Sequence, residues 1–292
     1  MRPIRTKAAP KGVFPKRFLM STLRRLGQEV GFTLPTLGAP GNGAGGRRAL
    51  RLRVQVYRAG RAVHGIEVTP EAGQACVEVW QPQWEAGLGG GSNDDDDLIA
   101  VEYLYGKEDE PWLGPIMSED IEGQFLARDS ASGRYSAVLT SMVPFRAAGY
   151  KFTPIIGLTH YHKFGPEWEN YTLFVNLRGG DDLDGNRMHV DYYDFGGARL
   201  AASDFVVPVN SGYLLPVEAT LAQLGVAPEA LEGGVISHCR GGASQFSIFT
   251  LIRNVRSGAV GIEHSLPPYY YVTGISHPAI RVPFYQRALA PA

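Results

Sequence analysis

Two histidines stand at alternate positions near the start of the stretch 157–197, and a carboxylate follows them: His160, His162 and Glu167. On a β-strand, residues i and i+2 point to the same face. Two imidazoles and a carboxylate on one side of a strand can bind a divalent metal and leave coordination positions open for oxygen or substrate. The spacing therefore predicts a candidate metal site. The alternative is that these histidines lie on a half-exposed strand or at a subunit contact.

The pattern H-x-H-x4-E after Gly157 resembles the first motif of the cupins, which are jelly-roll metal enzymes. The resemblance implies that the two histidines and the glutamate are metal ligands and that a later strand supplies a third histidine. The sequence departs from the motif, because the spacing from Gly157 to His160 is shorter and the closing glycine is absent. His189 or His238 would have to supply the third histidine.

Three further patterns contain residues that can do chemistry. The turn GGDDLDGN at 179–186 has oxygen donors at alternate positions like the start of a calcium loop, but it lacks the distal glutamate and also fits a hairpin turn. The run Asp94–Asp97 is interpreted as a solvated charge run, because consecutive aspartates do not wrap one ion. Ser237, His238 and Cys239 are adjacent, so on a strand they cannot form a catalytic dyad.

The elements that must position these residues are mostly strands. Alternating apolar and polar residues at 50–57 are followed by a turn at 58–61, and similar patterns recur to residue 263. A single internal helix is predicted over 216–224, where Pro216 stands early and Gly225 follows. About a dozen short strands without alternating helices indicate an all-β fold. We expect two tandem antiparallel β-sandwich or jelly-roll units, one over 48–164 and one over 165–292 with an aromatic C-terminal tail.

Residues 1–47 differ from the rest of the chain in composition. Eight lysines and arginines precede the first acid, Glu29, and prolines favour an extended start. Apolar residues spaced as on a helix (Leu19, Leu23, Leu26 and Val30) predict a short amphipathic helix, and the glycine-rich stretch 38–48 predicts a linker. The basic arm would contact nucleic acid, a lipid surface or a neighbouring subunit, or would be a solvated leader.

Composition limits the function classes. A hydrophobic content of 44% predicts a globular protein, and a net charge of -1 gives the whole chain no bulk attraction to nucleic acid or anionic membranes. The sequence lacks an apolar run of membrane-spanning length and the apolar core of a secretory signal. We expect a virion or cytoplasmic location. Cys76 and Cys239 would form one disulfide or remain two buried thiols.

Three functions remain. The plan of a basic arm, tandem β-units and an aromatic tail resembles jelly-roll virion capsid proteins, which implies a non-enzymatic structural subunit that associates with itself or with other subunits and needs no cofactor. The first alternative is a cupin-like enzyme with a divalent metal at His160, His162 and Glu167. The second is a carbohydrate- or surface-binding sandwich that uses the tryptophans, which would otherwise be core residues: Trp80, Trp84, Trp112 and Trp168.

Overall fold

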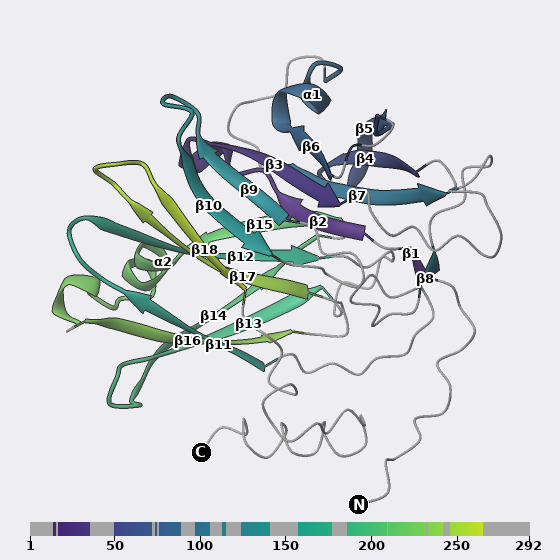
Figure 1. The fold of residues 1–292 in the computed structure, drawn as a ribbon. Coiled ribbons are helices and arrows are strands. Elements are labelled where there is room, and N and C mark those ends of the chain that lie inside the picture. The colour runs from purple at the N-terminus through teal and green to yellow at the C-terminus, as the bar shows by residue number, and fades with distance from the viewer. Residues whose placement is uncertain are drawn as a thin grey trace, which may run out of the picture.

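The computed structural model of the chain describes residues 14–15, 17–35, 50–71, 74, 76–88, 97–105, 113–114, 124–140, 157–176, 186–208, 210–231, 233–241 and 246–264. The basic arm to residue 13, the glycine-rich linker and the aromatic tail lie outside these residues, so the expectations for them stay predictions. The described residues form four antiparallel sheets of four strands, with two short α-helices, and the all-β sandwich prediction is confirmed (Figure 1).

The first sandwich consists of sheets I and II, drawn mostly in purple to blue in Figure 1. Sheet I has the order β2-β7-β4-β5, and sheet II has the order β10-β9-β3-β6. A separate short pair joins β1 (Phe14–Pro15) to β8 (Leu113–Gly114). The strands of the two sheets are β2 (Arg17–Ser21), β3 (Gln28–Pro35), β4 (Leu50–Arg58), β5 (Arg61–Val68), β6 (Cys76–Trp80), β7 (Leu98–Tyr105), β9 (Gln124–Asp129) and β10 (Tyr135–Thr140).

The second sandwich consists of sheets III and IV. Sheet III has the order β15-β12-β17-β18, and sheet IV has the order β11-β16-β13-β14. Their strands are β11 (Gly157–Lys163), β12 (Trp168–Asn176), β13 (Arg187–Tyr193), β14 (Arg199–Val206), β15 (Ser211–Pro216), β16 (Gly234–Gly241), β17 (Phe246–Asn254) and β18 (Val260–His264).

The two sandwiches repeat one topology. If the strands of each sandwich are numbered from first to eighth along the chain, one sheet has the order 1-6-3-4 and the other 5-2-7-8 in both. A short helix follows the fifth strand in each case: α1 (Gln81–Glu85) after β6, and α2 (Val217–Gln223) after β15. Eight antiparallel strands divided between two sheets form a β-sandwich. The chain is therefore a structural duplication.

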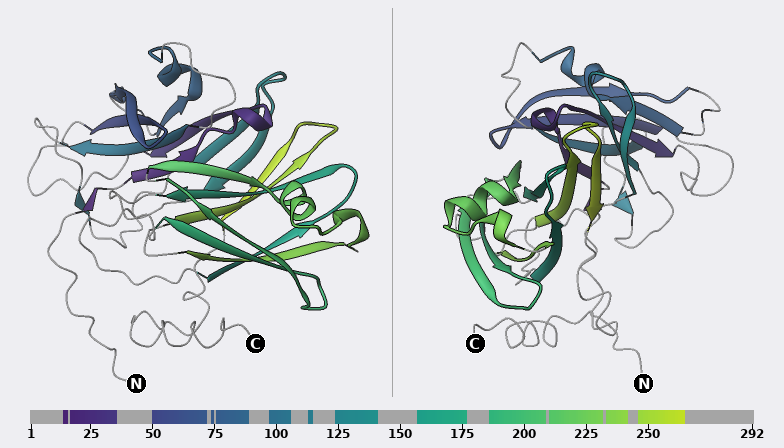
Figure 2. Two further views of the ribbon diagram at one scale, coloured as in Figure 1. Left: turned by 180° about the vertical axis from the view of Figure 1, so that it is seen from behind. Right: turned by 90° about the vertical axis from the view of Figure 1, so that its left-hand side faces the viewer.

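Sheet III joins the two sandwiches into one core, because it is buried on both faces. One face contributes Phe174, Leu215 and Ile248 to an apolar cluster with sheet IV. The other face contributes Leu173, Val175 and Phe249 to a cluster that continues through sheets I and II. Figure 2 shows sheet III lying between sheet IV and the first sandwich. Burial on both faces explains why residues 172–175 are a continuous buried run rather than an alternating one.

The joint between the sandwiches depends on a close approach of β15 to β2. A Cβ atom added to Gly212 would lie 2.7 Å from the Ser21 hydroxyl oxygen and 2.9 Å from its Cβ. Only glycine lets the two strands approach this closely without displacing one of them. Ser21 itself is fully buried and donates its hydroxyl proton to the backbone oxygen of Asp97.

Two sequence predictions fail at the unit boundaries. The prediction of an amphipathic helix before residue 31 is wrong. This segment forms β2 of sheet I and the start of β3 of sheet II, joined by the 3-10 helix η1 (Arg24–Leu26). Pairing with β7, β9 and β6 outweighs the helical spacing of the leucines. The predicted domain boundaries also shift, because β11 pairs with β16 and is the first strand of the second sandwich.

Other local predictions are confirmed. The predicted turn at 58–61 contains Ala59 and Gly60, whose φ angles of 48° and 78° suit a two-residue hairpin. The predicted internal helix is α2, and Gly225 follows it with φ 81°. Among the helices of the described ranges, none has the length and apolarity needed to cross a membrane.

Candidate functional site

The two histidines of the predicted metal site lie inside the second sandwich. His160 and His162 share the inner face of β11, and their side chains are 3% and 0% exposed. The Nε2 atom of His162 is 2.8 Å from the Ser237 hydroxyl of β16. The Nδ1 atom of His160 is hydrogen-bonded to the Thr250 hydroxyl of β17, on the facing sheet III. His160 therefore connects sheet IV to sheet III, whereas His162 links two strands of sheet IV.

Burial controls the protonation of this cluster. Desolvation, helped by the charge that His160 would add, lowers the pKa of His162 to about 3. Desolvation also raises the pKa of the Cys239 thiol to about 12, so this buried cysteine is not a thiolate at neutral pH. Ser237 and Cys239 share the inner face of β16 and are both fully buried. Both are buried polar groups, and neither residue can reach a substrate.

The third predicted ligand is elsewhere. Glu167 is half-exposed on the loop after β11 and forms an ion pair of 3.0 Å with Arg256. The two histidines that could have completed the set, His189 and His238, lie on the outer face of sheet IV, because the strand register places the pair His160–Ser237 on the inner face. The described part of the chain holds no group of three His, Cys, Asp or Glu side chains placed to bind a metal.

The outer face of sheet IV has an organised charged centre. Asp191 on β13 is only 4% exposed and receives hydrogen bonds from Arg199 (2.9 Å), Arg240 (2.5 Å) and His189 (3.1 Å). Burial alone would raise the pKa of Asp191, but the hydrogen bonds from Arg199 and His189 and the charge of Arg240 lower it. Asp191 is therefore a fixed anion that holds in place His189 of its own strand and one arginine from each neighbouring strand, β14 and β16.

An exposed aromatic pair lies on the same side of sheet IV. Tyr161 of β11 points to the outer face, because it alternates with the two buried histidines. Its ring stacks on Phe195, with centroids 5.0 Å apart and planes 23° apart. The two side chains are 55% and 44% exposed. A stacked, exposed pair of aromatic rings on a sheet face that also carries arginines has the composition of a protein–protein contact.

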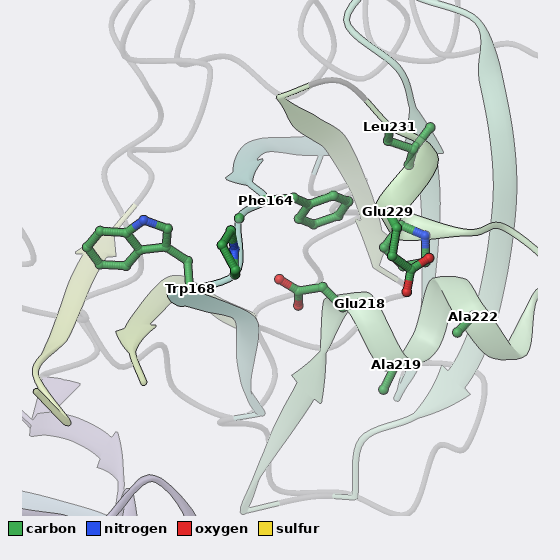
Figure 3. A pocket seen from close by; sticks show the side chains of 10 residues that line it. Phe164, Trp168, Glu218, Ala219, Ala222, Glu229 and Leu231 are labelled. Atoms are coloured by element: carbon green, nitrogen blue, oxygen red, sulfur yellow. The ribbon is translucent and has the colours of Figure 1, made fainter. Parts of the chain in front are cut away.

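A pocket of about 680 Å³ lies at one end of the second sandwich. It is formed where the connection between β11 and β12 meets the segment that contains α2 and the 3-10 helix η2 (Pro228–Ala230). Figure 3 shows the carboxylate of Glu218 turned toward the space beside Phe164 and Trp168. The lining residues are Phe164, Gly165, Pro166, Trp168, Glu218, Ala219, Ala222, Pro228, Glu229 and Leu231.

Glu218 is held firmly at this pocket. Its carboxylate accepts hydrogen bonds from the Asn170 backbone N–H (3.1 Å) and side-chain amide (2.6 Å). Desolvation raises the pKa of Glu218, and the hydrogen bonds from Asn170 offset only part of that rise. No lysine, arginine or histidine is among the described residues that line the pocket. The site is therefore an anionic pocket with aromatic walls.

The remaining sequence candidates fall in different places. Asp97 is the clearest correction: it is fully buried rather than solvated, and Arg24 and Arg58 bind it. Asp94 to Asp96 and the aspartates of the turn 179–186 are outside the described residues. Both cysteines are free, with Cys76 exposed and Cys239 buried, so the disulfide alternative is excluded.

The described tryptophans do not form one platform. Trp84 is buried in the first sandwich, Trp80 lies under the guanidinium of Arg128 at 4.0 Å, and Trp168 lines the pocket of the second sandwich. Trp112 is outside the described residues. Sequence reasoning also missed Glu218, which stands in the predicted helix without any distinguishing motif, and Asp191. The alternation of His189 and Asp191 on one strand face was a readable signal for the charged centre.

Comparisons with known proteins identify no family. No family model matches the chain, and no curated protein matches it. Among solved structures, a beta-glucuronidase from glycoside hydrolase family 2 aligns at 10% identity and a TM-score of 0.18. The apo b-glucuronidase from Ruminococcus gnavus aligns at 9% identity and a TM-score of 0.14. These alignments cover 88% and 86% of this chain but only 24% and 35% of the two enzymes. TM-scores this low do not define a shared fold.

Proposed function

We propose that this chain is a non-enzymatic structural subunit of a large protein assembly, most concretely a jelly-roll protein of the virion capsid type. The observation that carries the proposal is the duplication of one eight-stranded sandwich topology around a continuous core. Sheet III contributes to both apolar clusters, so the two sandwiches are packed against each other. A packed pair of sandwiches with several sheet faces is suited to making repeated contacts with its neighbours.

The outer face of sheet IV supports self-association. It combines the exposed stack of Tyr161 on Phe195 with arginines that Asp191 fixes in place. Aromatic residues and arginine are enriched in interfaces, and pre-ordered side chains lose less entropy when a partner binds. In the proposed assembly, this face contacts another subunit of the same kind.

The positions of the histidines favour a structural role over the cupin-like alternative. The buried side chains of β11 make structural hydrogen bonds, His162 within sheet IV and His160 across to sheet III, and Glu167 pairs with Arg256 instead of facing them. A metal-dependent activity would require these three side chains to converge on one open position.

The experiment measures the mass of the purified full-length chain by size-exclusion chromatography with light scattering, from dilute to concentrated solution. We expect oligomers or shells whose population increases with concentration. The double variant Tyr161→Ala/Phe195→Ala should reduce association, whereas Tyr135→Ala, which removes an exposed tyrosine of the first sandwich, is the matched control. A chain that remains monomeric throughout, or a double variant that associates as well as the control, would contradict the proposal.

A further inference from the structure

The repeated topology allows one place to be compared in both sandwiches. In each, the connection between the first and second strands meets the segment that contains the helix after the fifth strand. In the first sandwich these segments contain η1 and α1. In the second they contain residues 164–167 and α2, and they form the pocket described above. The two places thus have the same origin in the fold but different contents.

In the first sandwich an arginine of the chain itself fills this place. Arg24 of η1 donates from Nε to the Glu85 carboxylate of α1 at 2.9 Å and also forms an ion pair with it. Its Nη1 atom donates to Asp97, which precedes the sixth strand, at 3.1 Å. The guanidinium bridges two carboxylates from the segment between the fifth and sixth strands, and only 13% of the Arg24 side chain is exposed.

At the equivalent place in the second sandwich, two carboxylates are again present. No lysine, arginine or histidine is among the described residues that line it. Glu218 of α2 and Glu229 of η2 again come from the segment between the fifth and sixth strands. The opposite segment supplies Phe164 and Trp168 in place of an arginine, and a cavity of about 680 Å³ remains. Two carboxylates beside aromatic faces suit a guanidinium or ammonium group, which gains from both the charge and the ring quadrupole.

We propose that this pocket binds an arginine or lysine side chain of the basic N-terminal segment, residues 1–13, of a second copy of the chain. The segment contains Arg2, Arg5, Lys7 and Lys11 and no acidic residue, so its charge complements the pocket. The inference rests on the proposed function, because it assigns one contact between the subunits of that assembly.

Geometry favours a second copy over the same molecule. The N-terminal segment leads into β1, which lies on the opposite side of the molecule from α2 in the views of Figures 1 and 2. Thirteen extended residues reach at most about 45 Å at ~3.4 Å per residue. We therefore assign the contact to a neighbouring copy, which can present its pocket beside this segment.

The test titrates a fluorescent peptide of residues 1–13 into full-length protein, with fluorescence anisotropy as the readout. The receptor has Arg2, Arg5, Lys7 and Lys11 changed to Gln, so that its own segment does not compete. We expect saturable binding that weakens as salt increases. Glu218→Gln should weaken binding roughly tenfold or more, since one charged hydrogen bond contributes about 1.5–3 kcal/mol. Glu263→Gln, which changes an exposed glutamate of β18, is the matched control and should not change it.

A second variant tests the cavity without changing its charge. Ala222→Trp on the exposed side of α2 should fill the pocket and abolish peptide binding, while circular dichroism verifies that the fold is kept. Peptide binding that is indifferent to both Glu218→Gln and Ala222→Trp overturns the inference. Binding of neutral oligosaccharides in place of the peptide also overturns it.

The outcome also separates this inference from the proposed function. If the chain with four glutamines assembles like the wild type and the peptide does not bind, the inference fails and the structural role stands. If the peptide binds in the pocket but the wild-type chain never associates, the structural role fails instead.

Discussion

Mild acid should destabilise the protein through His162. The unfolded chain has an ordinary histidine pKa of 6.5, whereas burial lowers the pKa of His162 to about 3 in the folded state. As the pH falls below 6.5, the unfolded state takes up a proton that the folded state does not. The stability contributed by the neutral imidazole is therefore present above pH 6.5 and is lost progressively toward pH 3. Linkage gives a loss of about 2 kcal/mol between pH 7 and pH 5.

The assay is chemical denaturation at pH 7 and pH 5, with the free energy of unfolding as the measured quantity. The variant His162→Gln keeps a polar atom near Ser237 but cannot take up a proton, so its unfolding free energy should change about 2 kcal/mol less than that of the wild type between the two pH values. His64→Gln, on partly buried β5, is the histidine control and should follow the wild type. An equal pH dependence in wild type and His162→Gln would refute the reasoning.

Three more predictions concern packing and buried groups. Gly212→Ala should lower the free energy of unfolding by about 1–3 kcal/mol, because the new Cβ meets Ser21, and Ser21→Gly should restore part of it in the double variant. Asp97→Asn should lower the free energy of unfolding, measured by chemical denaturation, by about 3–5 kcal/mol, because it leaves two arginines without their buried carboxylate. A decrease below about 1 kcal/mol would contradict this. A thiol reagent should modify Cys76 in the native chain and Cys239 only after unfolding, whereas rapid modification of both would contradict the fold.

The strands with clear alternation were predictable from the sequence. The segment 98–105 and the strands on either side of the turn at Ala59 and Gly60 lie where the pattern predicts them. The strands β2 and β3 were not predictable, because the apolar residues before Gly31 also satisfy a helical spacing. These segments form strands by pairing with segments far along the chain. Long-range pairing is not visible in local periodicity.

The candidate site was harder to predict than the fold. The spacing of His160 and His162 correctly indicates one strand face, but it does not tell which face of the sheet is buried. The face that carries the histidines is buried because sheet III packs on it. Asp97 ends an acidic run and is nevertheless buried, because two arginines distant in sequence converge on it. The duplication is invisible in sequence, since the strand order repeats without a visible repeat of residue identities.

The outer face of sheet IV as a subunit contact is tested most directly by hydroxyl-radical footprinting of the full-length chain, compared between dilute and associated samples. Tyr161 and Phe195 are exposed in the single chain, so both should be oxidised readily in dilute protein. Association should protect this pair from oxidation. Tyr135, which is also exposed, serves as the internal reference. Equal oxidation of Tyr161 and Phe195 in dilute and associated protein would contradict the account.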